Sequence, residues 1–298
     1  MRKLVYTFLL VVQTGIVVTG GAVRLTGSGL GCPTWPQCTG ESYKPVPHQA
    51  QGAVHSWIEF GNRLLTFLVI IAILASLIGY RIWGRYRSDK KIVRFLLLGQ
   101  VLGIIAQIVV GGISVLTHLN PFAVGAHFLI SIFIIVATVS LRNRMLDLPR
   151  CERSSLNSST QKLSALILAL SCMVITLGVF VTGSGPHAGD ASAPRFAIDP
   201  RTISWLHADS VIAMIGLSVG LWFILKDNAP SLAKDKFSLF LITVFAQGFI
   251  GYTQYFTKLP EILVAAHMLG ATLVAITIWN YVFTINLFTR TNSTTMKS

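Results

Sequence analysis

The sequence predicts an all-α integral membrane protein whose eight transmembrane helices form two tandem four-helix bundles. Three observations predict this fold: long apolar stretches, an uneven distribution of basic residues between loops, and an internal repeat. Of the 298 residues, 53% are hydrophobic and 12% are charged, whereas a typical soluble domain has about 25% charged residues. A single soluble core could not bury so many stretches long enough to cross a bilayer.

Eight apolar stretches approach or exceed the length of about 20 residues that a helix needs to cross the hydrocarbon core. They cover residues 4–25, 57–80, 95–116, 122–141, 163–183, 205–225, 237–257 and 261–287. Only three residues precede the first stretch, and no small-residue cleavage site follows it, so we expect a retained helix rather than a signal peptide. The even number of spans predicts that both termini lie on the same side.

The distribution of basic residues predicts the orientation. Eighteen of the 24 lysines and arginines lie at the termini or in the loops after the second, fourth and sixth spans. They are Arg2, Lys3, Arg81, Arg85, Arg87, Lys90, Lys91, Arg94, Arg142, Arg144, Arg150, Arg153, Lys162, Lys226, Lys234, Lys236, Arg290 and Lys297. Because cytoplasmic loops carry the excess of basic residues, we expect a multi-pass plasma membrane protein with both termini in the cytoplasm. The orientation of the protein in the lipid bilayer then explains the net charge of +13, and no nucleic-acid partner is predicted.

An internal repeat divides the chain. Eight residues of the third and fourth spans recur 140 positions later without a gap, which indicates duplication. The pairs are Ala106/Ala246, Gln107/Gln247, Gly111/Gly251, Thr117/Thr257, Leu119/Leu259, Val124/Val264, Ala126/Ala266 and His127/His267. We predict an N-terminal half (1–145), a cytoplasmic linker (146–162) and a C-terminal half (163–298). Since each half has an even number of spans, a pseudo-twofold axis along the membrane normal should relate them.

Titratable side chains gather near the outer ends of the second and fourth spans of each half. Glu59 and Arg63 lie in the second span, His127 in the fourth, His207 in the sixth and His267 in the eighth. Such residues are rare within spans because hydrocarbon cannot solvate them, so we expect them to be functional. The second and fourth helices of a four-helix bundle are predicted to be diagonal, so their inward side chains can face one another.

Two imidazoles that face each other across an apolar bundle suit the two axial positions of a haem iron. His207 and His267 form such a pair in the second half. A zinc site fits less well, because no third or fourth ligand accompanies them. The alternative for each histidine taken singly is a hydrogen-bonded structural role.

The first half does not repeat this pair. The position equivalent to His207 falls near Asn62, and an amide is a poor iron ligand. Either His55 is the second ligand of an iron bound by His127, or that iron has an open or weakly bound position. His55, Glu59 and Asn62 share one helical face. An open or labile iron face beside a carboxylate can activate oxygen or steer protons. Glu59 is therefore the predicted catalytic residue, and its alternative role is a helix-initial acid paired with Arg63.

Two of the four cysteines lie in the first long outer loop and predict a disulfide there. Cys32 and Cys38 bracket PTWPQ in the first long outer loop, where an oxidising environment favours a disulfide. This disulfide would either staple the loop as a lid or act as an exchangeable redox pair. Cys151 and Cys172 are predicted to be free. The absence of CXXCH excludes conventional covalent haem attachment.

Four segments carry a resemblance to a known family: GGAVRLTGSGLGCPTWPQC at 20–38, IEFGNR at 58–63, GAHF at 125–128 and AAHM at 265–268. The chain resembles the haem A synthases of cytochrome oxidase assembly, in the form found in actinobacteria. This resemblance implies that a methyl group of the substrate haem O is oxidised to a formyl group. It further implies a permanent haem b on His207 and His267, with haem O beside Glu59 and His127.

The chain departs from the Bacillus-type members of this family, which have histidine in place of Asn62 and a second cysteine pair in the second half. The resemblance also implies coupling to haem O synthase, and a homo-oligomer is a further candidate assembly. Two other functions compete. A dihaem electron carrier that handles quinones would need two histidine ligands in both halves. A transporter with parallel repeats would need polar or broken helices near the middle of the membrane.

Overall fold

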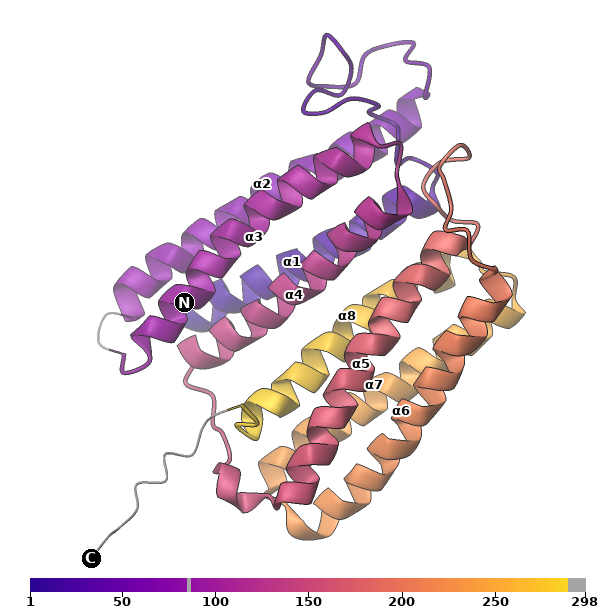
Figure 1. Cartoon of the computed structure of the whole chain (residues 1–298). Helices are drawn as coiled ribbons and strands as arrows, with labels where there is room; N and C mark the ends of the chain where they lie inside the picture. The colour runs from indigo at the N-terminus through magenta and orange to yellow at the C-terminus, as the bar shows by residue number, and fades with distance from the viewer. Residues whose placement is uncertain (85–86, 289–298) are drawn as a thin grey trace, which may run out of the picture.

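The computed structural model describes residues 1–84 and 87–288, which form eight long α-helices (Figure 1). The helices are α1 (Arg2–Leu25), α2 (Ala53–Trp83), α3 (Lys90–Leu116), α4 (Pro121–Met145), α5 (Ser158–Ser184), α6 (Pro200–Asn228), α7 (Ser231–Phe256) and α8 (Glu261–Thr284), with a short 3-10 helix, η1 (Arg153–Ser155), before α5. The described residues contain no strand, and all eight helices are long and apolar enough to cross a membrane. The predicted all-α membrane fold with eight spans is confirmed.

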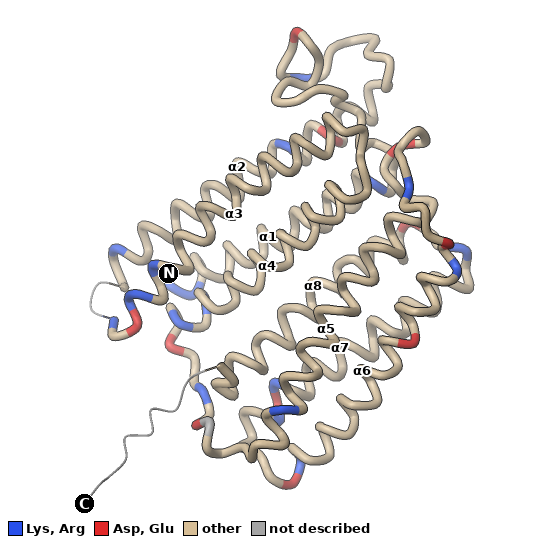
Figure 2. The backbone as a smooth tube through the Cα atoms, in the orientation of Figure 1, with Lys and Arg blue, Asp and Glu red and all other residues tan. Residues whose placement is uncertain are grey.

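Charged residues lie mainly at the two ends of the helices (Figure 2). The N-terminus, the turn between α2 and α3 and the end of α8 lie at one end of the molecule, which we call the inner end (Figure 1). The opposite end is the outer end. Arg85, Arg290 and Lys297, which the sequence assigns to the inner end, lie outside the described residues.

Most helices extend beyond the apolar stretches that predict them. α3 begins at Lys90 rather than at 95, α4 ends at Met145 rather than at 141, and α5 begins at Ser158 rather than at 163. Backbone groups near a bilayer are satisfied best inside a helix, and long basic side chains can reach the headgroups from a buried stem. The helices therefore continue into the basic segments, where the hydropathy signal has ended.

The eight helices form two four-helix bundles, α1–α4 and α5–α8, that lie side by side (Figure 1). In the first bundle, α1 packs against α2 and α4, and α3 packs against α4 and α2, so α2 and α4 are diagonal. The same arrangement makes α6 and α8 diagonal. Between the bundles, α8 contacts α1 and α4, and α4 contacts α5. Exchanging α1 with α5 and α4 with α8 reproduces these contacts, as a pseudo-twofold axis requires.

The closed apolar cores occupy the inner half of each bundle. The largest fully buried side chains are Tyr6, Leu9, Ile135, Leu141 and Met145 in the first bundle and Ile167, Leu221, Leu225, Phe237, Phe240, Tyr281 and Ile285 in the second. By contrast, His127, His207 and His267 lie near the outer ends and are only partly buried. The three histidines therefore lie outward of the largest fully buried side chains.

Helix caps fix where two of these histidines lie. The Asn120 side chain accepts a hydrogen bond from the backbone N–H of Phe122 at 3.0 Å at the start of α4. Asp199 accepts one from the Thr202 N–H at 2.8 Å at the start of α6. Proline follows each cap, where its missing N–H costs nothing. His127 and His207 thus lie about two turns inside a defined outer helix start.

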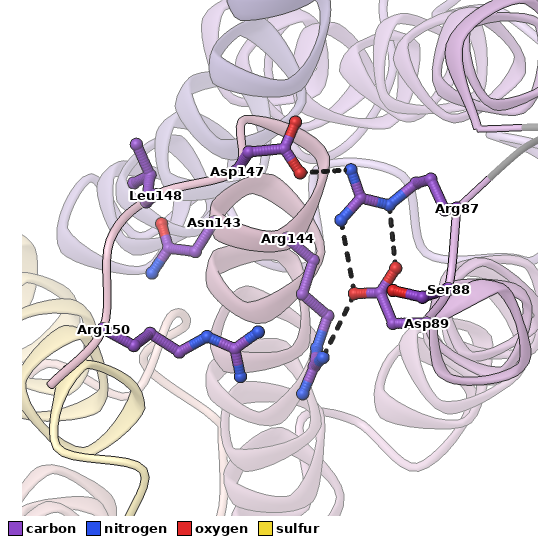
Figure 3. A pocket seen from close by; sticks show the side chains of 8 residues that line it. All are labelled: Arg87, Ser88, Asp89, Asn143, Arg144, Asp147, Leu148 and Arg150. Atoms are coloured by element: carbon purple, nitrogen blue, oxygen red, sulfur yellow. Dashed lines mark hydrogen bonds and ion pairs between the residues drawn. The ribbon is translucent and has the colours of Figure 1, made fainter. Parts of the chain in front are cut away.

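At the inner end, a pocket of about 280 Å³ lies between the α2–α3 turn and the end of α4 (Figure 3). Arg87 pairs with Asp89 at 2.8 Å and with Asp147 at 2.6 Å, and Arg144 pairs with Asp89 at 3.3 Å. Burial disfavours the Asp89 carboxylate, but hydrogen bonds and positive charge from Arg87 and Arg144 outweigh it and hold the pKa of Asp89 below its ordinary value of 3.8. The network fastens the turn to α4.

Candidate functional site

Each of the three predicted histidine ligands packs against a glycine of a neighbouring helix. A Cβ atom at Gly111 of α3 would lie 3.1 Å from Cε1 of His127, and one at Gly251 of α7 would lie 3.0 Å from Cε1 of His267. A Cβ atom at Gly178 of α5 would lie 3.4 Å from Cε1 of His207. Glycine therefore lets each imidazole lie directly against the adjacent backbone.

The Nδ1 atom of His127 is buried and has no hydrogen-bond partner, whereas the rings of His207 and His267 interact with the backbone of Val174 and Gln247. A buried polar atom without a partner costs about 1–3 kcal/mol, which argues against a purely structural role for His127. The described residues contain no group of three or more His, Cys, Asp or Glu side chains that could hold a metal ion. Haem needs only axial ligands, and the residues present fit it better than they fit a zinc ion.

A glutamine supports the histidine-bearing helix in each half. The Gln107 amide of α3 donates to the His127 carbonyl oxygen at 3.1 Å, and the Gln247 amide of α7 donates to the His267 carbonyl oxygen at 2.7 Å. The sequence shows both residues as members of the repeat but does not show this contact. Their shared offset of 140 with the histidines is the signal that points to it.

His207 and His267 lie on the diagonal helices α6 and α8, close enough for their charges to interact. In the first bundle, the sequence predicts that Asn62 of α2 lies near the position equivalent to His207. A Cβ atom at Gly20 of α1 would lie 3.8 Å from Nδ2 of Asn62. The Asn62 amide oxygen accepts a hydrogen bond from Thr19 at 2.8 Å.

His55, the other candidate ligand of the first half, is an exposed residue near the start of α2. Its Nδ1 and the Ser28 hydroxyl form a hydrogen bond of 2.9 Å. This contact connects His55 to the first outer loop, whereas Asn62 lies about two turns deeper on the same helix.

Glu59 is 5% exposed and fully engaged. Its Oε2 accepts a hydrogen bond from the Cys32 backbone N–H at 2.6 Å, and its Oε1 accepts from Arg63 at 2.6 and 3.1 Å. Arg63 also donates to the carbonyl oxygens of Cys32, Thr34 and Gln37 at 2.8–3.2 Å. The expected pairing of Glu59 with Arg63 is present. The sequence does not reveal that both side chains hold the cysteine loop.

The disulfide between Cys32 and Cys38 is present, with a Cα–Cα distance of 4.3 Å. Cys151 and Cys172 are free, as predicted. Between the bridged cysteines, the Trp35 ring packs so closely on α3 that a Cβ atom at Gly112 would lie 2.6 Å from it. The adjacent residue on α3 is Gly111, which contacts His127. The disulfide loop therefore lies over the outer end of the first bundle, near Glu59 and His127.

Comparison with known proteins adds a family match to this geometry. The family model described as "Cytochrome oxidase assembly protein", COX15-CtaA, matches residues 3–278. A protein of Parvibaculum lavamentivorans named "Heme A synthase" is 24% identical over 311 residues, which covers 89% of each chain. One of that name from Azorhizobium caulinodans is 23% identical, over 88% of this chain and 87% of the relative. A third, from Geobacillus thermodenitrificans, is 30% identical over 124 residues, and there the chain spans about a third of the relative's length.

Proposed function

Because the chain belongs to the COX15-CtaA family of cytochrome oxidase assembly proteins, we propose that it acts as a haem A synthase. In this reaction a methyl group of haem O is oxidised to a formyl group, giving haem A for cytochrome oxidase. The observation that carries the proposal is the family match over residues 3–278. This range includes both bundles, the disulfide loop and all three inward histidines.

In the C-terminal half, we propose that His207 and His267 would hold haem b. Their positions on diagonal helices and their contacts with Gly178 and Gly251 support this assignment. Haem b held there would supply one-electron transfer. The protein contributes the position of His267, because Gly251 lets the ring lie against α7 and the Gln247 amide donates to the His267 carbonyl oxygen.

In the N-terminal half, we propose that His127 binds the iron of the substrate haem O and that Asn62, rather than His55, lies opposite. Asn62 lies partly buried about two turns deeper on α2 than the exposed His55, which supports this choice. The amide oxygen of Asn62 also accepts a hydrogen bond from the Thr19 hydroxyl. A weak ligand at this position favours methyl oxidation over simple electron transfer, so it disfavours the dihaem electron carrier.

Glu59 is the proposed catalytic residue of the first half. Oxidation of a methyl group to a formyl group releases protons, and Glu59 is a buried carboxylate on the same helix as Asn62. Its Oε2 accepts a hydrogen bond from the Cys32 N–H and its Oε1 accepts one from Arg63, so the carboxylate has a fixed position. We propose that it accepts a proton or stabilises positive charge as the methyl group reacts.

We further propose that the protein spans the plasma membrane with its inner end in the cytoplasm. The concentration of lysine and arginine at that end supports this orientation. Haem O synthase is the proposed source of the substrate and a homo-oligomer the candidate assembly. The actinobacterial subtype stays a prediction.

Expression in a host that makes haem O but no haem A tests the proposed function. Pigments extracted from its membranes and separated by chromatography should contain haem A only when the chain is present. The matched control is the same host with an empty vector. Membranes that contain the haem-loaded protein and haem O, but no haem A, would contradict the proposal.

A further inference from the structure

Arg24, in the last turn of α1, is a cation without a carboxylate partner in the described part of the chain. Its Nε is buried and has no hydrogen-bond partner, and its Nη2 donates to the Thr182 carbonyl oxygen at 3.2 Å. Burying a guanidinium group is costly unless an anion compensates for the lost hydration. The structure therefore shows a positive charge at the outer end that lacks its counter-charge.

The Arg24 guanidinium reaches from the first bundle to the second. Thr182 lies in α5, one turn outward from Gly178, and its hydroxyl donates to the Gly178 carbonyl oxygen at 2.7 Å. Residues four apart share a helix face, and Gly178 is the residue that His207 contacts. Arg24 thus lies about one turn outward of the His207 ring, at the rim of the site in the second half.

The second outer loop packs around Arg24. A Cβ atom at Gly189 would lie 3.3 Å from Cγ of Arg24, and the Gly189 carbonyl oxygen accepts a hydrogen bond from the Gly29 N–H at 2.8 Å. Arg195 in the same loop donates to two loop carbonyl oxygens and lies close enough for its charge to act on Arg24. Two positively charged side chains therefore lie near each other where the halves join.

The acidic residues of this loop do not neutralise them. Asp190 accepts hydrogen bonds from the Ser192 N–H and hydroxyl at 2.8 and 2.6 Å. Asp199 caps α6 and accepts from the Thr202 N–H and hydroxyl at 2.8 and 2.6 Å. Among the described residues neither carboxylate forms an ion pair with Arg24 or Arg195, so a bound anion is the candidate counter-charge.

We propose that Arg24 binds a propionate of the haem held by His207 and His267, with Arg195 as a second positive charge nearby. The inference rests on the proposed function. A porphyrin between α6 and α8 would expose its propionates toward the polar outer rim, and guanidinium is the side chain best suited to pair with a carboxylate. A residue of the first half would then help to hold the cofactor of the second.

The proposal has a thermodynamic consequence. Reduction of the iron adds an electron, so a nearby positive charge favours the reduced haem. Removing the charge of Arg24 should therefore lower the haem b midpoint potential and weaken haem binding. A charge-assisted hydrogen bond lost from a partly buried site should weaken binding about tenfold or more.

The test compares purified full-length wild type with Arg24→Gln, Arg24→Lys and the control Arg201→Gln. Arg201 is an exposed outer arginine that stacks on Trp205 at 4.5 Å, and its replacement makes the same change in charge. Haem b per chain and the midpoint potential are measured by haemochrome assay and redox titration. We expect Arg24→Gln to lower the potential and the haem content, Arg24→Lys to be intermediate, and Arg201→Gln to match wild type.

A second measurement does not depend on the folding of a variant. Wild-type chain made in haem-deficient cells is titrated with haem b and with its dimethyl ester, which lacks the propionate charges. The ester should bind about tenfold more weakly or worse. Equal binding of ester and acid would overturn the inference, as would an unchanged potential and haem content in Arg24→Gln. It would also be overturned if Arg24→Gln lost a bound phospholipid but kept its haem b. Wild type that binds no haem b would instead overturn the proposed function together with this inference.

Discussion

At the scale of single residues, glycines decide whether the histidines can take their positions. A Cβ atom at Gly251 would lie 3.0 Å from Cε1 of His267, which is tighter than ordinary contact, whereas Gly220 of α6 has no such neighbour within 4 Å. Gly251→Ala should therefore tilt or displace the His267 ring. The expected result is a weakened or shifted low-spin haem spectrum.

The matched control is Gly220→Ala, which should leave the spectrum unchanged and alter stability by no more than about 1 kcal/mol. Optical and electron paramagnetic resonance spectra of the two purified proteins make the comparison. Identical spectra for Gly251→Ala and wild type would show that the ring does not depend on this contact.

Glu59 carries the residue-scale prediction for chemistry. Glu59→Gln keeps an oxygen that can accept from the Cys32 N–H but removes the charge paired with Arg63. If the carboxylate takes part in the reaction, the variant should retain bound haem and accumulate haem O or a partly oxidised product. Chromatography of the extracted haems measures this.

If Glu59 only pairs with Arg63, loss of this buried charge should destabilise the protein by up to about 3–5 kcal/mol and leave the turnover of the folded protein near normal. Haem A formation at the wild-type level by Glu59→Gln would remove Glu59 from the catalytic residues.

At the scale of elements, Arg63 fastens the disulfide loop to α2 through three loop carbonyl oxygens. Arg63→Gln should release this loop, because a glutamine cannot reach all three oxygens. Tyr43, which follows the disulfide loop in the same outer segment, is 69% exposed, so chymotrypsin should cleave there faster in the variant than in wild type. Equal cleavage rates, with the Cys32–Cys38 disulfide intact in both, would mean that the disulfide alone orders the loop.

The ion-pair network at the inner end predicts a pH dependence. Because its pairing with Arg87 and Arg144 lowers the pKa of Asp89, its contribution to stability is complete above pH 3.8 and is lost as the pH falls through the lower folded-state value. Asp89→Asn should lower the thermal midpoint at pH 7, and its effect should become smaller as the pH falls below 3.8. An effect of equal size at neutral and acid pH would contradict an electrostatic role.

At the scale of the whole molecule, apolar spans, loop charges and the repeat predict the two bundles because each signal extends over many residues. The same signals predict His127 and His267 as equivalent, and the diagonal helices bring His207 toward His267. Backbone contacts made by irregular loops leave no periodic trace. The contacts of Glu59 with the Cys32 N–H and of Arg24 with the Thr182 carbonyl oxygen therefore appear only in the structure.

The sequence also underestimates the helix lengths, because hydropathy falls where lysine and arginine begin although the helix continues. The two residues that the sequence offers as second ligand of the first half, His55 and Asn62, lie two turns apart on the same face of α2. The contact of Gly20 with Asn62 and the hydrogen bond of His55 with Ser28 supply the positions that periodicity cannot.

The central claim is that the two bundles bind different haems through different ligand sets. The most direct test is to extract and identify the haems of His127→Ala and His267→Ala. Each variant is expressed in a host that makes haem O, and its insertion into the membrane is verified first. The account predicts that His127→Ala keeps haem b but neither binds haem O nor forms haem A, whereas His267→Ala loses haem b. Retention of normal haem b by His267→Ala, or loss of both haems to the same extent in the two variants, would contradict it.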